Sequence, residues 1–165
     1  MNSDKLYLVN VTECPIQRPK DTTIQKEYYS GKKKTHTIKI QIIIDENAKR
    51  IISIAFDKGS VHDYNLFKQA TEPIKKEIPF IADSGYQRIT NLFEKSITQK
   101  KKSKNHPLNE EDKSLNHLIS IIRIPVEHVN CQVKIFRVLA ERYRSHIKTF
   151  FRRAILICQF YNLCL

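Results

Sequence analysis

Two acidic residues of the chain occupy positions where a hydrolytic site could use a carboxylate. Asp83 follows the apolar, strand-like residues 78–82, and Glu127 lies just after Pro125 in a segment with helical spacing. Carboxylates on separate elements can hold two Mg²⁺ ions about 3.5–4 Å apart, which clamp the attacking and leaving oxygens of a phosphodiester. Each acid alone is weak evidence for a metal site. An Asp before Ser-Gly-Tyr is more often a turn former. An acid near a helix start is stabilised by the helix dipole without any catalytic function.

Three strand-like segments precede these acids. Residues 6–11 form a short β-prone run, residues 38–44 alternate isoleucine with Lys39 and Gln41, and residues 51–56 follow after a turn. A period of two is typical of a half-buried strand, so the second and third segments are expected to form an antiparallel hairpin.

The remaining segments are expected to be helices or loops. Residues 16–36 are polar and basic and predict a long loop or a twisted hairpin arm. Ser60 is expected to cap a helix over residues 61–71, and another helix is expected over residues 109–122. Pro125 suits the start of a new helix. The buried stripe of this new helix is expected to consist of Val126, Val129, Val133 and Phe136.

The order of elements predicts an α/β fold, a mixed sheet flanked by helices as in ribonuclease H-like proteins. A chain of 165 residues has room for one domain with a real core. We expect a single catalytic domain over residues 1–165, with the ribonuclease H-like core at about 5–140. One or two basic amphipathic helices are expected to follow at about 137–165.

The charge balance points to a polyanionic partner. There are 29 basic and 17 acidic residues, which gives a net charge of +12, and nucleic acid is the leading partner for so basic a domain. The alternative is a lysine-rich surface that serves only solubility.

Cysteine spacing and hydropathy exclude other classes. The four cysteines have no CxxC spacing and no paired histidines nearby, which argues against a structural zinc ion and against a disulfide framework. The longest apolar run is far below the roughly 20 residues that span a bilayer, and the start does not resemble a secretion signal. We therefore expect a cytoplasmic protein.

Several blocks resemble those of one known family in its order. Residues 9–19, Val-Asn-Val-Thr-Glu-Cys-Pro-Ile-Gln-Arg-Pro, are similar to the first catalytic block of DDE transposases of bacterial insertion sequences and Harbinger-like elements, which normally reads Asp-x-Thr-Glu. The later blocks that resemble the family lie at residues 28–39, 59–63, 82–87, 100–104 and 126–129, at Asn116, Arg123 and Lys134, and at residues 142–144. The resemblance extends from about residue 7 to 162.

The resemblance implies the roles of individual residues. Asn10 occupies the place of the first catalytic acid, Asp83 that of the second and Glu127 that of the third. Asp83 and Glu127 would be ligands of Mg²⁺ or Mn²⁺. Asp63, in the His-Asp pair after Gly-Ser, is a fourth candidate metal ligand, and the alternative is an early-helix residue stabilised by the helix dipole. His62 would orient a phosphate or a water molecule, or would have a purely structural role.

The departure at Asn10 matters most, because the family's first aspartate is shared by both metal ions. An amide is neutral and offers one carbonyl oxygen, so metal affinity and rate are expected to fall sharply. Glu13 is not expected to replace it, because residues three apart on a strand point to opposite faces.

Basic residues are expected to track the DNA backbone, although each alone is more often a solvated surface residue. The candidate DNA-binding residues are Lys32, Lys33, Lys34, Lys100, Lys101, Lys102, Lys104, Arg123, Lys134, Arg142 and Arg144. The partners implied are transposon ends and target DNA, with a homodimer on DNA. The family's N-terminal helical DNA-binding domain is expected from a separate polypeptide, or the chain is a truncated remnant.

Three functions follow from these observations. The first is a metal-dependent DNA strand-transfer nuclease. The second is a catalytically dead remnant that still binds DNA, and it differs from the first at Asn10. An unrelated basic RNA-binding module would require the ordered blocks to be accidental.

Overall fold

The sheet is built around one long strand pair. In the computed structural model, which describes residues 5–71, 74, 77–102 and 107–165, β1 (Tyr7–Pro15) pairs antiparallel with β3 (Thr35–Asp45) over its whole length. β3 also pairs antiparallel with β4 (Ile51–Lys58). The predicted hairpin is therefore confirmed, and the first strand is longer than predicted.

The other half of the sheet is parallel. β5 (Phe80–Ala82) runs parallel to β1, and β6 (Ile97–Thr98) runs parallel to β5. The order along the sheet is β2-β3-β1-β5-β6, with β2 (Tyr29–Ser30) on β3 and β4 also paired to β3. This mixed sheet flanked by helices is the ribonuclease H-like architecture that the sequence predicts.

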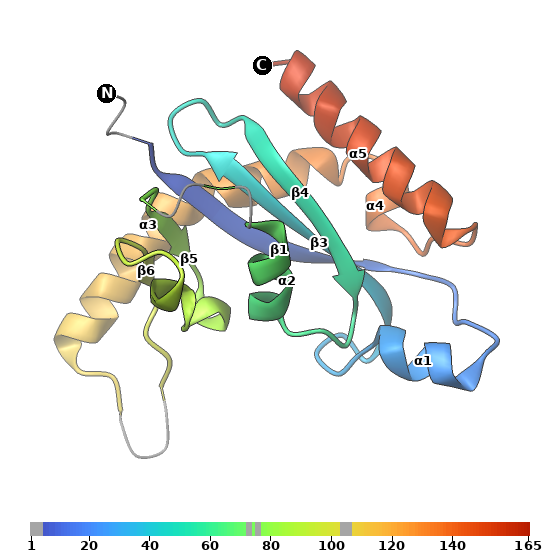
Figure 1. Cartoon of the computed structure of the whole chain (residues 1–165), viewed down its shortest axis with the longest axis horizontal. Coiled ribbons are helices and arrows are strands. Elements are labelled where there is room, and N and C mark those ends of the chain that lie inside the picture. The colour runs from blue at the N-terminus through green and yellow to red at the C-terminus, as the bar shows by residue number, and fades with distance from the viewer. Residues whose placement is uncertain (1–4, 72–73, 75–76, 103–106) are drawn as a thin grey trace.

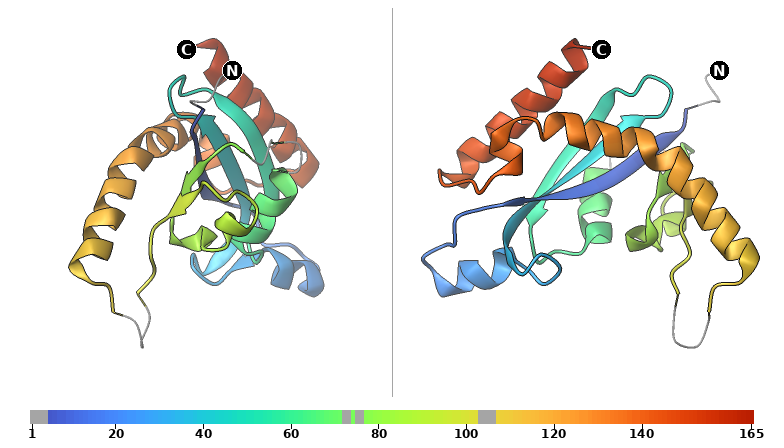
Figure 2. Two further views of the ribbon diagram at one scale, coloured as in Figure 1. Left: turned by 60° about the vertical axis from the view of Figure 1, so that its left-hand side comes forward. Right: turned by 180° about the vertical axis from the view of Figure 1, so that it is seen from behind.

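Helices cover both faces of the sheet (Figures 1 and 2). α3 (Glu110–Val133), α4 (Arg137–Ala140) and α5 (Ile147–Leu163) supply side chains to the core on one face. α2 (Asp63–Ala70) and the short helices η1 (Ser84–Tyr86) and η2 (Ile89–Asn91) pack on the other. β3 is buried over residues 37–44, whereas residues 10–13 of β1 stay partly exposed.

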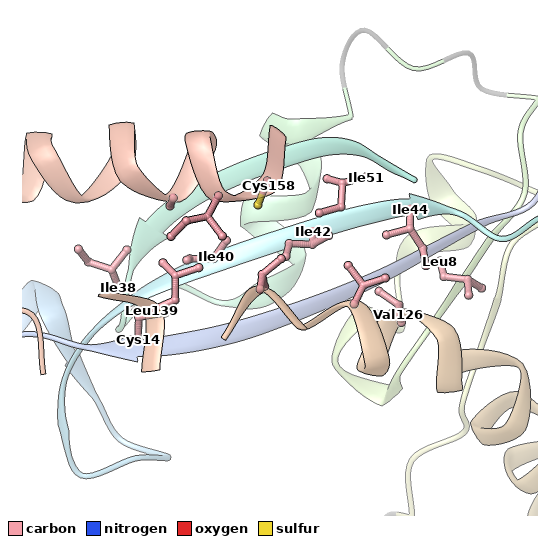
Figure 3. Packing of buried hydrophobic residues seen from close by; sticks show 14 of the residues in the cluster. Leu8, Cys14, Ile38, Ile40, Ile42, Ile44, Ile51, Val126, Leu139 and Cys158 are labelled. Carbon is pink, nitrogen blue, oxygen red and sulfur yellow. The ribbon is translucent and has the colours of Figure 1, made fainter. Parts of the chain in front are cut away.

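The alternation along β1 divides its side chains between two cores. Leu8 and Cys14 lie in the larger core, together with the even-numbered isoleucines of β3 and residues of α3 and α5 (Figure 3). Tyr7 and Val9 lie in the second core, where the rings of Phe67 and Phe80 pack edge to face with centroids 5.1 Å apart. Burial of this apolar surface is the main force that holds the helices on the sheet.

One helix replaces the two that were predicted around Pro125. α3 runs without a break from Glu110 to Val133 with Pro125 inside it, so the prediction of a new helix at Pro125 is wrong. Proline lacks an N–H and crowds the preceding turn, which bends a helix, and Figure 2 shows that α3 is curved. Val126, Val129 and Val133 are buried as predicted, whereas Phe136 lies beyond the helix and is 41% exposed.

The basic segment after β1 is more ordered than predicted. The expected loop or arm at residues 16–36 contains α1 (Thr22–Tyr28), whose N-cap Asp21 accepts hydrogen bonds from the backbone N–H groups of Thr23 and Ile24. Lys32, Lys33 and Lys34 lie in the turn between β2 and β3, where they are exposed. This turn needs a positive φ of 54° at Lys34.

The predicted cap of α2 is also wrong. α2 begins at Asp63 and is capped by His62. The Ser60 hydroxyl instead donates to the backbone oxygen of Glu27 and ties this loop to α1. α4 and α5 confirm the predicted pair of C-terminal helices. Within the described residues, no helix is long and apolar enough to cross a membrane.

Candidate active site

Strand register places Asn10 and Asp83 side by side. β1 and β5 pair in parallel, with Tyr7 opposite Phe80 and Leu8 opposite Ile81. Continuing the same register brings Asn10 level with Asp83, which directly follows β5. Both residues are half-buried. The first and second positions of the predicted acid set are therefore neighbours, and the first carries an amide.

Asp83 is held by the turn that it begins. It is the N-cap of η1, and its Oδ1 accepts a hydrogen bond of 2.8 Å from the backbone N–H of Gly85. This bond orients the carboxylate at the end of the strand. It also accounts for a turn-forming role of Asp83 that requires no metal.

Asp63 approaches Asp83 at Gly85. A Cβ atom added to Gly85 would lie 2.9 Å from Oδ1 of Asp83 and 3.5 Å from Oδ2 of Asp63. The missing side chain at Gly85 therefore leaves room for the two carboxylates to converge on one place. Asp63 is the first residue of α2. The alternative role, an acid stabilised by the helix dipole, therefore also fits its position.

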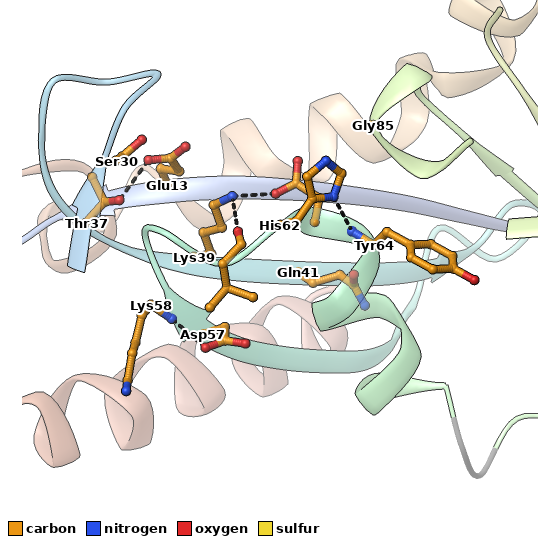
Figure 4. Close-up of polar contacts among 12 residues, drawn as sticks. Glu13, Ser30, Thr37, Lys39, Gln41, Asp57, Lys58, His62, Tyr64 and Gly85 are labelled. Carbon is orange, nitrogen blue, oxygen red and sulfur yellow. Dashed lines mark hydrogen bonds and ion pairs between the residues drawn. The ribbon is translucent and has the colours of Figure 1, made fainter. Parts of the chain in front are cut away.

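Lys39 neutralises one oxygen of Asp63, an interaction that sequence reasoning missed. Its ammonium donates to Oδ1 of Asp63 and to the backbone oxygen of Val61, both at 2.6 Å, and its side chain is only 11% exposed (Figure 4). In the alternating pattern of β3, Lys39 lies on the polar face of the strand. Because α2 and its preceding loop cover that face, the lysine is buried beside a carboxylate.

Tyr86 is the last residue of η1 and is buried in the second core. It is 1% exposed, and its hydroxyl donates to Oε1 of Gln41 at 3.4 Å. Burial, with further contributions from Asp63 and Asp83, raises the pKa of Tyr86 well above its usual value, and Arg123 opposes this effect. The phenol is therefore neutral at physiological pH.

Glu127 does not lie at the start of a helix. It lies in the C-terminal half of α3, so the helix-dipole explanation for this acid does not apply. Its side chain is 54% exposed, and Oε1 lies 3.8 Å from Nη1 of Arg123, whose side chain is only 8% exposed. α3 packs against β1 and β5, the two strands that carry Asn10 and Asp83.

The oxygen donors near the end of β5 are not grouped as a metal site in the described residues. In the part of the chain that the structure describes, no three His, Cys, Asp or Glu side chains are grouped so that they could hold a metal ion. Position 10 supplies an amide, one oxygen of Asp63 binds Lys39, and Glu127 is near Arg123. Mg²⁺ prefers such oxygen ligands, and the neutral amide of Asn10 leaves one carboxylate fewer than an aspartate at this position would give.

A hollow of ≈ 370 Å³ opens beside the two acids. It is lined from α2 by His62 and Tyr64, from η1 by Ser84 and Gly85, and by Lys101. His62 caps α2 through a long hydrogen bond of 3.4 Å from the backbone N–H of Tyr64 to Nδ1 (Figure 4). His62 therefore has a structural role as the cap of α2, and its exposed ring also borders the hollow.

The predicted DNA-binding residues are in different environments. Exposed positions are held by Lys32, Lys33, Lys34, Lys100, Lys101, Lys102, Arg142 and Arg144. Lys100 pairs with Asp112, and Lys134 donates to the backbone oxygen of Glu13 at 3.4 Å. Arg123 is buried, which distinguishes it from a surface contact. Lys104 lies outside the described residues.

The mixed sheet flanked by helices belongs to the ribonuclease H-like class of folds. The family model of the DDE superfamily endonucleases matches residues 9–161, and the chain belongs to this family.

A curated relative gives a closer comparison. A protein of Microchaete diplosiphon, described as "Probable transposase for insertion sequence element IS702", is 40% identical over 161 residues, which is 98% of this chain and 58% of the relative. The chain therefore spans somewhat more than half the length of that relative. No solved structure matches the chain.

Proposed function

We propose that the chain is the catalytic domain of a DNA transposase and that Asn10 has weakened or abolished its metal-dependent cleavage and transfer of DNA strands. The observation that carries the proposal is the β1–β5 register, which makes Asn10 the neighbour of Asp83. Membership of the DDE superfamily endonucleases, whose enzymes use divalent metal ions, supports the reaction class. Mg²⁺ or Mn²⁺ would supply the Lewis acid for water and for a DNA 3′-hydroxyl.

The chemical argument concerns charge. A carboxylate at position 10 could bridge two cations, whereas the amide of Asn10 offers one neutral oxygen. In our proposal Asp83 and Glu127 are the remaining catalytic acids, and Asp63 is a further metal ligand. The ion pair with Lys39 leaves Asp63 one oxygen for that role.

The alternative is a remnant that binds DNA without cleaving it. The amide at Asn10 and the buried ammonium of Lys39 beside Asp63 both favour it, because they lower the negative charge available to cations. Binding to transposon ends and target DNA through the exposed lysines and arginines is common to both functions. Homodimerisation on DNA, a separate helical DNA-binding polypeptide and association with the nucleoid are further parts of the proposal.

The decisive experiment is nicking of supercoiled plasmid DNA in Mn²⁺. We compare the purified chain with its Asn10→Asp variant, and with Asn10→Asp/Asp83→Ala as the matched control for contaminating nuclease. We expect at least a tenfold faster nicking by Asn10→Asp, because the variant restores the missing carboxylate.

Each other outcome has a definite meaning. Nicking that survives Asp83→Ala would refute the site. Equal nicking by wild type and Asn10→Asp would show that position 10 is not a metal ligand. Absence of nicking by both proteins, with DNA binding intact, would favour the binding remnant.

A further inference from the structure

Two adjoining hollows lie at the end of the molecule where β1 leaves the sheet. The larger, of ≈ 910 Å³, lies between residues 16–24 and residues 143–148, and the smaller, of ≈ 700 Å³, lies along residues 137–153. They share Tyr143, Arg144 and Ser145. We call the two hollows together the β1–α5 groove.

Backbone pairing fixes the walls of this groove. Ile16 and Tyr143 form a parallel bridge, the N–H of Gln17 donates to the oxygen of Tyr143 at 2.7 Å, and the N–H of Tyr143 donates to the oxygen of Pro15 at 2.9 Å. The chain leaving β1 and the chain entering α5 therefore lie side by side, and Figure 1 shows both at the same end of the sheet. Two segments far apart in the sequence form one surface.

The groove is strongly basic. Arg18, Lys20, Arg144 and Lys148 line the larger hollow, which has no acidic residue in its lining. The smaller hollow adds Arg137, Arg142 and Arg153 to Arg144. Its one acid is Glu141, whose Oε1 lies 3.6 Å from Nε of Arg137. The lining of the two hollows therefore carries seven basic residues and one acidic residue.

Two of these guanidinium groups are positioned by neutral partners. Arg18 donates to Oε1 of Gln25 at 2.9 and 3.1 Å, and the Gln25 amide in turn donates to the backbone oxygen of Pro19 at 2.9 Å. The guanidinium of Arg153 lies over the ring of Tyr143, 5.8 Å from its centroid. An amide and an aromatic ring orient a cation without neutralising it, so both arginines keep their full charge for a ligand.

The amino end of α5 adds to the same potential. His146, Ile147 and Lys148 begin this helix and line the larger hollow, and the first turn contains no acidic residue and no side-chain cap. The positive end of the helix dipole therefore reinforces the arginines and lysines around it.

We propose that the β1–α5 groove binds the sugar–phosphate backbone of DNA. Several cations spread over two hollows that share lining residues suit a polymer of phosphates better than a single anion. The choice of DNA as the polymer rests on the proposed function. Six residues of strand at roughly 3.3 Å each separate Asn10 from Ile16, so the groove holds DNA about 20 Å from the candidate active site.

The test is DNA binding by fluorescence anisotropy with a labelled 30-base-pair duplex in EDTA, which removes metal chemistry from the measurement. The groove variant is Arg18→Gln/Arg144→Gln/Lys148→Gln. The matched control, Arg50→Gln/Lys68→Gln/Lys95→Gln, removes three exposed cations outside the groove. Circular dichroism melting checks that all the proteins fold.

We expect the groove variant to bind at least tenfold more weakly than the control. The magnitude of the slope of log affinity against log salt should fall by about 2 to 3, because each lost phosphate contact lowers this magnitude by about 0.9. A charge-retaining variant, Arg18→Lys/Arg144→Lys, should bind within about threefold of wild type, since backbone binding is mainly electrostatic.

Equal loss of binding in the groove variant and the control would overturn the proposal, as would wild-type binding that prefers duplex RNA. Failure of the groove and failure of the proposed function are distinguishable. Nicking by Asn10→Asp together with normal binding by the groove variant would reject the groove alone. Loss of binding in the groove variant without nicking by Asn10→Asp would reject the catalytic proposal alone.

Discussion

At the residue scale, charge pairing around Asp63 determines what the candidate site can do. One oxygen of Asp63 binds the ammonium of Lys39, while the other lies near Gly85 and Asp83. A side chain at position 85 would displace the Asp83 carboxylate, because its Cβ would lie 2.9 Å from Oδ1. Lys39 therefore reduces the negative charge of the acid pair and also fixes the position of the N-terminal end of α2.

Removal of Lys39 tests this coupling. We expect Lys39→Met to lower the free energy of unfolding in urea by about 1–3 kcal/mol, because Asp63 loses its partner in a partly buried place. In the double variant Lys39→Met/Asp63→Asn, the loss should be smaller than the sum of the two single losses by about 1 kcal/mol. Additive losses would show that the ion pair contributes nothing to the fold.

At the element scale, the position of α3 depends on a well-formed amino end and a bend at Pro125. Asn109 forms a capping box with Asp112, and three acidic residues follow in the first turn. Asp112 also binds Lys100, whose hydrogen bonds lower the pKa of this carboxyl group. These contacts join the start of α3 to the basic segment after β6, while the C-terminal half of the helix carries Glu127.

Loss of the cap should destabilise the chain by a modest amount. In Asn109→Ala the backbone N–H of Asp112 loses its acceptor, which lies 2.6 Å away, and we expect a fall of about 1 kcal/mol in urea unfolding. Asn109→Ser is the matched control, because serine caps a helix about as well. A loss of the same size in Asn109→Ser would contradict the capping role.

At the scale of the whole molecule, helices on both faces bury residues that the alternating strands would leave half exposed. Cys14 is 0% exposed in the larger core, to which α3, α4 and α5 contribute. Burial raises the pKa of its thiol to about 12; the charge of Lys134 lowers this pKa and that of Glu13 raises it. The folded state therefore keeps this thiol neutral at pH values where the unfolded chain ionises it.

Stability should consequently fall at high pH through Cys14. The pKa of the Cys14 thiol is higher in the folded state than in the unfolded chain. The contribution of Cys14 to stability is therefore complete below pH 9 and declines as the pH rises toward about 12. Relative to Cys14→Val, wild type should lose about 1 kcal/mol of unfolding free energy per pH unit from pH 9 to 11, measured in urea at each pH. Parallel profiles of the two proteins would show that Cys14 is not shielded from water.

The sequence by itself determined the local features of this protein. Alternating isoleucines predict the β3–β4 hairpin, and the valines of α3 predict its buried stripe, because side-chain periodicity follows backbone geometry. The family resemblance assigns Asn10, Asp83 and Glu127 to the places of the three catalytic acids, and this assignment stays a prediction.

Only the tertiary structure decided which residues meet. The β1–β5 register sets Asn10 beside Asp83, and helices on both faces turn the polar side of β3 into a buried one that holds Lys39 against Asp63. The β1–α5 groove joins residues 16–24 to residues 137–153. Such pairings depend on packing between segments distant in the chain, where burial outweighs local preference, as in the unbroken helix through Pro125.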